Sequence, residues 1–200
     1  MKKLLYSFAI LYALSLCQAT STDKLKVTVF FESLCPGCRY FILTHLYPVY
    51  LELESYLEIE VVPFQWCSEY EGKWTCRCQH GTDECLGNSY DSCALVNNTT
   101  KVALEFIHCL EQKKISDETF QLCAKQANIP YEDLKHCAET QALDLLIDYS
   151  KKAKEFKIDH LPTIAFNDKY DKSVDDDAYL NFKKVVCKFL SNPPKECSTD

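Results

Sequence analysis

Cysteine is the residue that most constrains what this chain can fold into, because 13 of its 200 residues are cysteines. Cysteines at this density ligate metal ions in many intracellular proteins and form disulfides in proteins of oxidising compartments. The N-terminus predicts which compartment applies. Residues 1–19 carry two lysines after the first methionine, then a short apolar run, and end in the small residue Ala19. This pattern is typical of a secretory signal peptide cleaved after Ala19, so we expect residues 20–200 to form the mature domain.

The predicted signal peptide decides how the cysteines are interpreted. Cleavage would remove Cys17 and leave an even number of cysteines, as a disulfide framework requires. The apolar run is shorter than the about 20 residues that span a bilayer, so we expect no membrane insertion. Two overlapping sequons predict glycosylation at Asn97 or Asn98, which agrees with passage through the secretory pathway. We therefore expect a protein of the secretory pathway, located in lysosomes or endosomes or secreted.

The N-terminal part of the mature chain predicts a strand, a helix and a second strand. Residues 25–31 are rich in β-branched and aromatic residues and predict a buried strand. Apolar residues at helical spacing follow, and Pro48 is expected to kink this helix. Residues 57–64 predict the second strand. Such a unit implies parallel pairing of its two strands.

The middle of the chain predicts an insertion at about residues 65–140. Residues 65–98 have neither helical nor strand periodicity but hold five cysteines, so we expect a loop region held by disulfides. Short helices are expected around 102–110, 120–127 and 134–137, followed by a longer one at 140–156.

The C-terminal part predicts a return to the sheet. Residues 163–166 predict a strand, which a turn joins to a short edge strand near 169–170. A final helix is expected from about Asp175, whose charge suits a helix N-terminus. Its expected buried residues are Tyr179, Phe182, Val185, Val186, Phe189 and Leu190. The order of elements predicts an α/β protein with a thioredoxin-like fold, a disulfide-rich loop and a helical insertion.

The segment Cys35-Pro36-Gly37-Cys38 is the sharpest chemical signal, because it lies where the first strand turns into its helix. A C-x-x-C motif also occurs in zinc sites and in structural disulfides. At a helix start, however, Pro36 suits the first helical position, and main-chain N–H groups can point at the Cys35 sulfur. These groups and the helix dipole favour the thiolate. We expect Cys35 to attack a substrate disulfide and Cys38, which should be buried, to resolve the mixed disulfide.

Leu161-Pro162 is the expected substrate-binding element. In thioredoxin-like folds a cis-proline before the third strand faces the C-x-x-C motif and presents the preceding residue's main chain to an extended substrate. The sequence alone leaves the isomer of Pro162 open, since most X-Pro bonds are trans. His160 could approach Cys35 and stabilise its charge, although a surface histidine is the simpler interpretation.

Residues 78–93 carry a family resemblance. They match the pattern C-Q-H-G-x-x-E-C-x-x-N-x-x-x-x-C at every fixed position. This segment resembles the signature of the gamma-interferon-inducible lysosomal thiol reductase family. The order of signal peptide, C-x-x-C, signature and late Leu-Pro extends the resemblance over nearly the whole mature chain. The resemblance implies that Cys35 and Cys38 are the redox pair. It also implies reduction of protein disulfides at acidic pH in endosomes and lysosomes, which helps to unfold proteins for proteolysis and antigen processing.

Without the family resemblance, residues 78–93 predict structural roles. Cys78, Cys85 and Cys93 are expected to be bridged, and Gly81 to mark a tight turn. Asn88 and Glu84 could bond the exposed main chain of the loop. A zinc site formed by His80 and the nearby cysteines is the alternative, which oxidation in the secretory pathway disfavours. We expect no metal. The ten cysteines outside the active pair can form five disulfides, but their pairing does not follow from the sequence.

The predicted function is a thiol oxidoreductase that reduces disulfides of protein substrates. A small thiol or another reductant then reduces its own active-site disulfide. No organic cofactor is implied, because the dithiol itself carries the two electrons. The formal net charge of −7 argues against a nucleic-acid partner. One alternative is an oxidase or isomerase of the secretory pathway, although the last four residues, 197–200, are not an endoplasmic-reticulum retention signal. Another is a non-catalytic, disulfide-stapled secreted binding protein.

Overall fold

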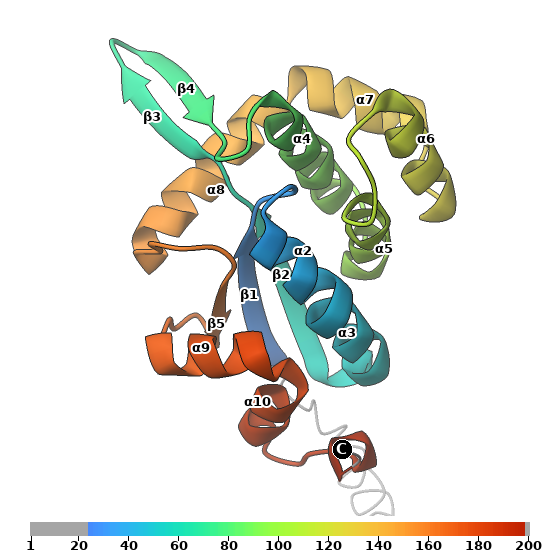
Figure 1. The fold of residues 1–200 in the computed structure, drawn as a ribbon, viewed down its shortest axis with the longest axis vertical. Helices are drawn as coiled ribbons and strands as arrows, with labels where there is room; N and C mark the ends of the chain where they lie inside the picture. Colours follow the sequence, from blue (N-terminus) through green and yellow to red (C-terminus); the bar gives the residue numbers. More distant parts are fainter. Residues whose placement is uncertain (1–23, 199–200) are drawn as a thin grey trace, which may run out of the picture.

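A three-stranded sheet with the order β2-β1-β5 forms the centre of the protein (Figure 1). The structure is a computed structural model that describes residues 24–198. The predicted signal peptide lies outside the described residues. Strand β1 (Leu25–Phe31) pairs in parallel with β2 (Leu57–Pro63) and antiparallel with β5 (Thr163–Phe166). The predicted strand–helix–strand unit is therefore confirmed, with parallel pairing of its two strands.

The helix between β1 and β2 changes its hydrogen-bonding pattern before Pro48. It consists of α2 (Pro36–Phe41), a π-helical turn (Ile42–Leu46) and α3 (Tyr47–Leu53). Proline has no N–H to donate, and its ring would clash with the carbonyl group four residues earlier in a regular α-helix. The wider π-helical turn lies where that clash would occur. The disturbance expected at Pro48 thus takes the form of a local change of helix type.

The prediction of a loop over residues 65–98 is wrong, because this region contains a β-hairpin and a long helix. The hairpin consists of β3 (Trp66–Tyr70) and β4 (Lys73–Arg77), and Figure 1 shows it projecting from the body of the molecule. Glu71 and Gly72 connect the strands with φ angles of 49° and 74°, as a tight hairpin turn requires. Most residues of both strands are exposed, and β3 shows no alternation of apolar and polar residues. Strand β4 does alternate, but over only five residues, and the loop prediction overlooked it.

Helix α4 (Thr82–Val96) escaped prediction because its buried face is largely polar. Four polar side chains of this helix are almost completely buried: Glu84, Asn88, Asp91 and Ser92. Periodicity of apolar residues detects a helix only when an apolar face packs against the core. Here hydrogen bonds to the main chain and to other side chains replace part of that apolar face.

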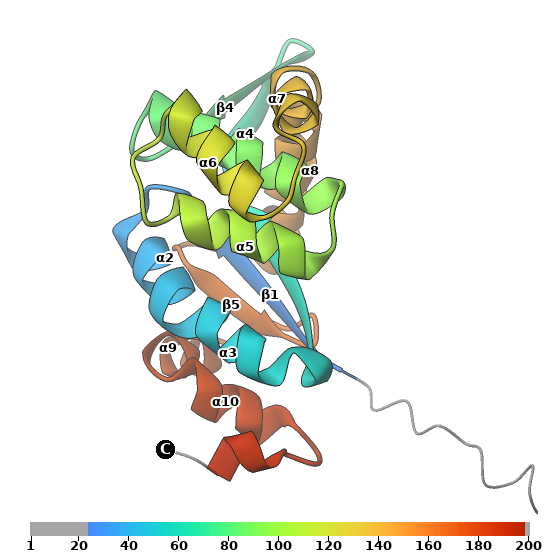
Figure 2. The same cartoon turned by 90° about the vertical axis from the view of Figure 1, so that its right-hand side faces the viewer.

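The helical insertion continues as predicted. Its further helices are α5 (Thr100–Leu110), α6 (Asp117–Gln126) and α7 (Tyr131–Thr140), and α8 (Ala142–Phe156) returns the chain to the sheet. Figures 1 and 2 show α4 to α7 grouped together on one side of the sheet. The helices that cover β5 come from the C-terminal part of the chain.

Ten cysteines of the described part of the chain form five disulfides, as expected. The pairs are Cys67–Cys76, Cys78–Cys85, Cys93–Cys137, Cys109–Cys123 and Cys187–Cys197. Four of these bridges join residues of the hairpin and the helical insertion. The insertion is therefore cross-linked within itself and does not depend on a bridge to the sheet.

The C-terminal elements differ from prediction in two ways. A single bridge between Phe166 and Lys169 replaces the expected edge strand, because the two-residue turn leads directly into a helix. The expected final helix is divided into α9 (Lys172–Leu180) and α10 (Phe182–Phe189). Asn181 causes the break: its backbone leaves the helical region, with φ −152° and ψ 72°, and its side chain accepts a hydrogen bond from the Lys184 N–H.

The two C-terminal helices bury only part of the apolar set expected for them. Phe182, Val185 and Val186 are buried, whereas Phe189 is 40% exposed. Tyr179 and Leu190 are half-buried. Within residues 24–198, no helix combines the length and the apolar character needed to cross a bilayer.

Candidate active site

Cys35 and Cys38 are the two cysteines of the described chain that carry free thiols. Cys35 immediately precedes α2 with an extended backbone, and Pro36 occupies the first position of the helix. This is the local geometry that the motif predicted. Both side chains are shielded, but Cys35 is 7% exposed and Cys38 is fully buried. A reagent from solution can therefore reach the Cys35 sulfur before that of Cys38.

The pKa of the Cys35 thiol is lowered to about 6, and its largest cause is a hydrogen bond from the Cys38 thiol. Burial opposes this shift, while the N–H groups of Cys38 and Gly37 and the charge of His80 support it. The helix end makes no conventional capping hydrogen bond with the Cys35 side chain. The sequence pattern predicted this effect from the helix terminus, whereas the largest single contribution comes from the neighbouring thiol. Burial raises the pKa of Cys38 well above its ordinary value, so the two thiols differ strongly in acidity.

Leu161 and Pro162 lie against this dithiol, as the sequence predicted. The Leu161-Pro162 peptide bond is cis. The Cys35 thiol is 3.9 Å from the Leu161 carbonyl oxygen, to which it donates a hydrogen bond. A Cβ placed on Gly37 would lie 3.4 Å from Pro162 Cδ, so the proline ring packs directly on the C-x-x-C segment. Four predicted site residues from distant parts of the chain therefore meet at one place.

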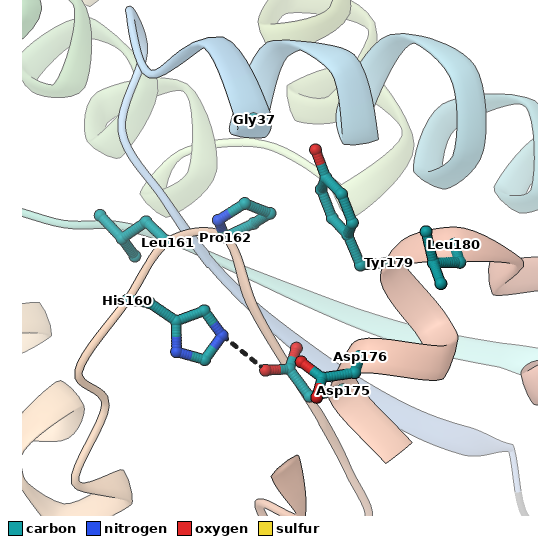
Figure 3. Close-up of a pocket in the computed structure, with 8 residues that line it drawn as sticks. All are labelled: Gly37, His160, Leu161, Pro162, Asp175, Asp176, Tyr179 and Leu180. Carbon is teal, nitrogen blue, oxygen red and sulfur yellow. Dashed lines mark hydrogen bonds and ion pairs between the residues drawn. The ribbon is translucent and has the colours of Figure 1, made fainter. Parts of the chain in front are cut away.

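A cavity of about 360 Å³ opens beside Gly37 and the Leu161-Pro162 segment (Figure 3). Tyr179 and Leu180 of α9 form another part of its wall, and Asp175 and Asp176 lie at its polar end. The cavity thus combines apolar walls with acidic groups next to the dithiol. Such a mixture is typical of a small binding site.

His160 lines this cavity but does not bond Cys35. Its Nδ1 lies 2.7 Å from Asp159 Oδ1 and its Nε2 lies 2.7 Å from Asp175 Oδ2. Burial alone would lower the pKa of His160, but its hydrogen bonds to the two carboxylates and their charges raise it. Asp175 also accepts a hydrogen bond from the Ile164 N–H at 2.9 Å. Asp175 therefore holds both sides of the Leu161-Pro162 segment, and it also lies in the first turn of its helix, where the sequence predicted an acidic charge.

The signature segment holds the loop that leads to Cys35. Asn88 Oδ1 accepts hydrogen bonds from the main-chain N–H and from the hydroxyl of Ser33, both at 2.9 Å, while Asn88 Nδ2 donates to the Phe64 carbonyl. The Ser33 hydroxyl also lies 2.7 Å from Asp91 Oδ2. Sequence reasoning treated Asn88 as a loop-stabilising residue and missed Ser33 and Asp91. The fixed position of Asn88 in the signature was the available signal.

Gly87 is expected to tolerate no side chain. An alanine Cβ at this position would lie 2.7 Å from Ser33 Oγ and 2.8 Å from Ser33 Cβ. Since Ser33 is buried and bonded, Gly87→Ala should destabilise the protein by about 2 kcal/mol, despite the better helix propensity of alanine. Denaturant unfolding of this variant and of the exposed neighbour Leu86→Ala measures the difference. Equal stability of Gly87→Ala and the unaltered protein would contradict this packing argument.

Besides Asp175, four carboxyl groups of the region around the dithiol are buried, and sequence reasoning predicted none of their burial. They are Glu32, Glu84, Asp91 and Glu111. Burial is the main cause that raises the pKa of Glu32 to about 8 and that of Asp91 to about 7. Burial also raises the pKa of Glu111 well above its ordinary value, although Arg39 lies 3.7 Å away. Neither Glu32 oxygen has a hydrogen-bond partner within the described structure.

The zinc alternative with His80 and the nearby cysteines is wrong, because Cys78 and Cys85 are bonded to each other. One atom each of Glu32, His80 and Glu84 lie within 4.8 Å of one another, and these residue types can bind a divalent cation. However, His80 Nδ1 and Glu84 Oε1 are 2.6 Å apart. Two ligands of a tetrahedral zinc ion lie about 3.3 Å apart, so this shorter contact favours a shared proton over a shared metal.

The two sequons lie between α4 and α5, far along the chain from the dithiol. Asn97 is exposed at the end of α4. Asn98 is half-buried, and its side-chain amide donates to the Ala94 carbonyl at 3.0 Å. Both residues therefore belong to the surface of the helical insertion.

Known proteins resemble this chain in sequence and in fold. Residues 26–127 match the family model described as "Gamma interferon inducible lysosomal thiol reductase (GILT)". GILT-like protein 1 of Drosophila melanogaster is 32% identical over 204 residues, which cover 90% of this chain and 81% of that protein. A gamma-interferon-inducible lysosomal thiol reductase of Carassius auratus is 28% identical over 189 residues, which cover 90% and 75% of the two chains.

Solved structures confirm the expected thioredoxin-like fold. Oxidised BdbD from Bacillus subtilis matches with a TM-score of 0.60 at 18% identity, over 84% of this chain and 88% of that chain. A thioredoxin-like oxidoreductase from Silicibacter pomeroyi matches with a TM-score of 0.52 at 14% identity, over 82% and 88%. The family match and the relatives make this chain a protein-disulfide oxidoreductase. It belongs to the gamma interferon inducible lysosomal thiol reductase family.

Proposed function

We propose that this protein reduces disulfides of other proteins in an acidic compartment, with Cys35 as nucleophile and Cys38 as resolving thiol. The observation that carries the proposal is the free dithiol whose more exposed member has a pKa of about 6. At pH 5 such a thiol is about one-tenth ionised, whereas an ordinary thiol with a pKa of about 8.5 is only about 0.03% ionised. The thiolate is the attacking species, so the difference decides whether reduction proceeds in acid.

The reaction transfers two electrons from the dithiol to the substrate. The Cys35 thiolate attacks one sulfur of the substrate disulfide, which forms a mixed disulfide and releases the other substrate sulfur as a thiolate that takes up a proton. The Cys38 thiol then loses its proton, and its sulfur attacks the Cys35 sulfur. This step forms the Cys35–Cys38 disulfide and releases the second substrate thiol. A small thiol or another reductant restores the dithiol.

Substrate binding is assigned to Leu161 and Pro162. The main chain at Leu161 lies next to the Cys35 sulfur, and the cavity of about 360 Å³ beside it can take up a side chain that flanks the substrate cysteine. An extended substrate segment would place its disulfide over Cys35 in this arrangement. Protein substrates that contain accessible disulfides are therefore the expected partners.

The acidic, endosomal or lysosomal location is part of the same proposal. It is supported by the signal-peptide pattern of residues 1–19, the sequons at Asn97 and Asn98 and the five disulfides. The mature protein would then comprise residues 20–200, with the insertion at about 65–140 as part of one domain. Membership of a thiol reductase family disfavours the non-catalytic binding protein.

Reductase activity is tested with a fluorescence-quenched protein disulfide and a small-thiol reductant at pH 4.5–5.5. We expect the unaltered protein to accelerate reduction at least about 100-fold over the Cys35→Ser/Cys38→Ser variant, because the variant has no dithiol to carry electrons. A rate equal to that of the variant would contradict the proposal. If the protein instead forms disulfides in a reduced protein faster than it cleaves them, the oxidase alternative is correct.

A further inference from the structure

The signature segment places a histidine and a carboxylate beside the buried Glu32. His80 is about one-third exposed and Glu84 is fully buried. Glu84 contacts His80 twice: Oε2 accepts a hydrogen bond from the His80 N–H at 2.8 Å, and Oε1 lies 2.6 Å from the ring Nδ1. The backbone and the ring of His80 are therefore both held by one carboxylate.

Glu32 connects this pair to the dithiol. Its carbonyl accepts a hydrogen bond from the Cys35 N–H at 3.2 Å, and its own N–H donates to Cys38 Sγ at 3.5 Å. Both of its carboxyl oxygens are buried without a hydrogen-bond partner in the described part of the chain, and one of them lies within 4.8 Å of a polar atom of His80 and of Glu84. A buried carboxyl group without a hydrogen bond is costly, and a neighbouring cation reduces that cost. His80 is the side chain in this cluster that can supply one.

We propose that His80 and Glu84 are a positioning pair for disulfide reduction, in which Glu84 holds the His80 imidazolium beside Glu32 so that its charge favours the Cys35 thiolate in acid. The inference rests on the proposed function and assigns a role to two residues of the signature. Histidine ordinarily carries a positive charge below about pH 6.5.

Other charged groups near Cys35 do not supply this charge. Arg39 of α2 is directed to Glu111, with its Nε 2.8 Å from the Glu111 carbonyl oxygen and 3.7 Å from the Glu111 carboxylate. His160 is hydrogen-bonded to Asp159 and Asp175. Among the described residues, the other titratable groups that act on the dithiol are acids: the Cys38 thiol, Tyr179 of α9, and the carboxyls of Glu32 and Glu111. Glu84 and Asp91 act in turn on these two carboxyls.

The test measures the rate at which iodoacetamide alkylates Cys35 in the reduced, otherwise intact protein between pH 4 and pH 8. Cys38 is fully buried and does not compete. We expect His80→Gln to lower the rate at pH 5 about threefold or more, because the thiolate fraction falls when the cation is lost. His80→Lys, which keeps the charge, should restore the rate to within about twofold of the unaltered protein. His136→Gln, at an exposed position of α7, is the matched control and should have no effect.

Glu84→Gln gives the sharpest result because two effects on Cys35 oppose each other. Removal of a nearby negative charge should by itself favour the thiolate. If Glu84 acts by holding the His80 imidazolium, the variant should instead alkylate about twofold more slowly at pH 6. Faster alkylation, or a His80→Gln profile identical to that of the unaltered protein, would overturn the inference. Mass spectrometry should find five disulfides and two free thiols in each variant, which excludes misfolding as the cause.

Alkylation requires no protein substrate, so this test is independent of the proposed function. A protein that reduces no disulfide but shows the expected His80 and Glu84 effects would refute the function and keep the positioning pair. A protein that reduces disulfides, but whose Cys35 alkylation rate is unchanged by both substitutions, would keep the proposed function and refute the positioning pair.

Discussion

Replacing Cys38 with alanine is expected to stop turnover and to leave Cys35 covalently joined to the substrate. The attack by Cys35 needs no second thiol, but release of the substrate from the mixed disulfide does. Multiple-turnover reduction should therefore fall at least about 100-fold, while a mixed disulfide accumulates. Non-reducing electrophoresis with a disulfide-bonded protein substrate detects this species, and Cys35→Ser, which has no attacking sulfur, should not form it.

The same substitution is expected to change the chemistry of Cys35 itself. A hydrogen bond from the Cys38 thiol is the largest cause of the low Cys35 pKa of about 6. Without it the pKa should rise towards the ordinary value, and the thiolate fraction at pH 5 should fall at least about tenfold. Cys38→Ser is the matched control, because its hydroxyl can still donate to the Cys35 sulfur. Equal alkylation rates in both variants would show that the helix terminus, rather than Cys38, sets the acidity of Cys35.

The second large effect concerns stability, which is expected to fall as the pH rises from 5 to 8. Glu32 and Asp91 have pKa values of about 8 and about 7 in the folded protein, because burial disfavours their charged forms. A carboxyl group whose pKa is higher in the folded state keeps its proton only when the chain is folded. Each such group therefore costs about 1.4 kcal/mol of stability for every pH unit between its unfolded and folded pKa values.

Other groups modify this slope without reversing it. The raised pKa values of Glu111, Asp175 and His160 act in the same direction, since each group binds its proton more tightly in the folded protein. The lowered pKa of Cys35 makes stability rise with pH between about pH 6 and pH 9. The pKa values of His45 and His108 are also lowered, so these residues make stability rise with pH in the range below the ordinary histidine pKa. The net loss from pH 5 to pH 8 should be at least on the order of 4 kcal/mol.

Denaturant unfolding at pH 5, 6.5 and 8 measures this loss. Both tryptophans, Trp66 and Trp74, lie in the projecting hairpin, so far-ultraviolet circular dichroism is the better probe of the whole fold. The Cys35→Ala/Cys38→Ala variant prevents exchange of disulfides at high pH. In that background Asp91→Asn should be more stable than its parent at pH 8 and about equal at pH 5, because the amide resembles the protonated acid. A stability that is constant or rises with pH would refute the role of the buried carboxyls.

Sequence reasoning succeeded where a local pattern causes the local structure. The strand at 25–31, the helix start at Cys35 and the helices of the insertion follow from apolar periodicity, proline placement and capping. It failed for α4, whose buried face is polar, and for the break at Asn181, where the apolar spacing continues across the interruption. In both cases the deciding interactions are hydrogen bonds, which periodicity does not detect.

By itself the sequence determined the chemistry of this protein: a C-x-x-C dithiol at a helix start, a Leu-Pro pair before a late strand, and a dense set of cysteines for disulfides. These features depend on residue type and on neighbours along the chain. Only the tertiary structure decided what surrounds the dithiol. Ser33 meets Asn88 across 55 positions of sequence and Cys35 meets Leu161 across 126, and burial beneath them changes the acidity of carboxyls that look ordinary in the sequence. Packing brings these groups together and removes them from water, and no local pattern specifies either effect.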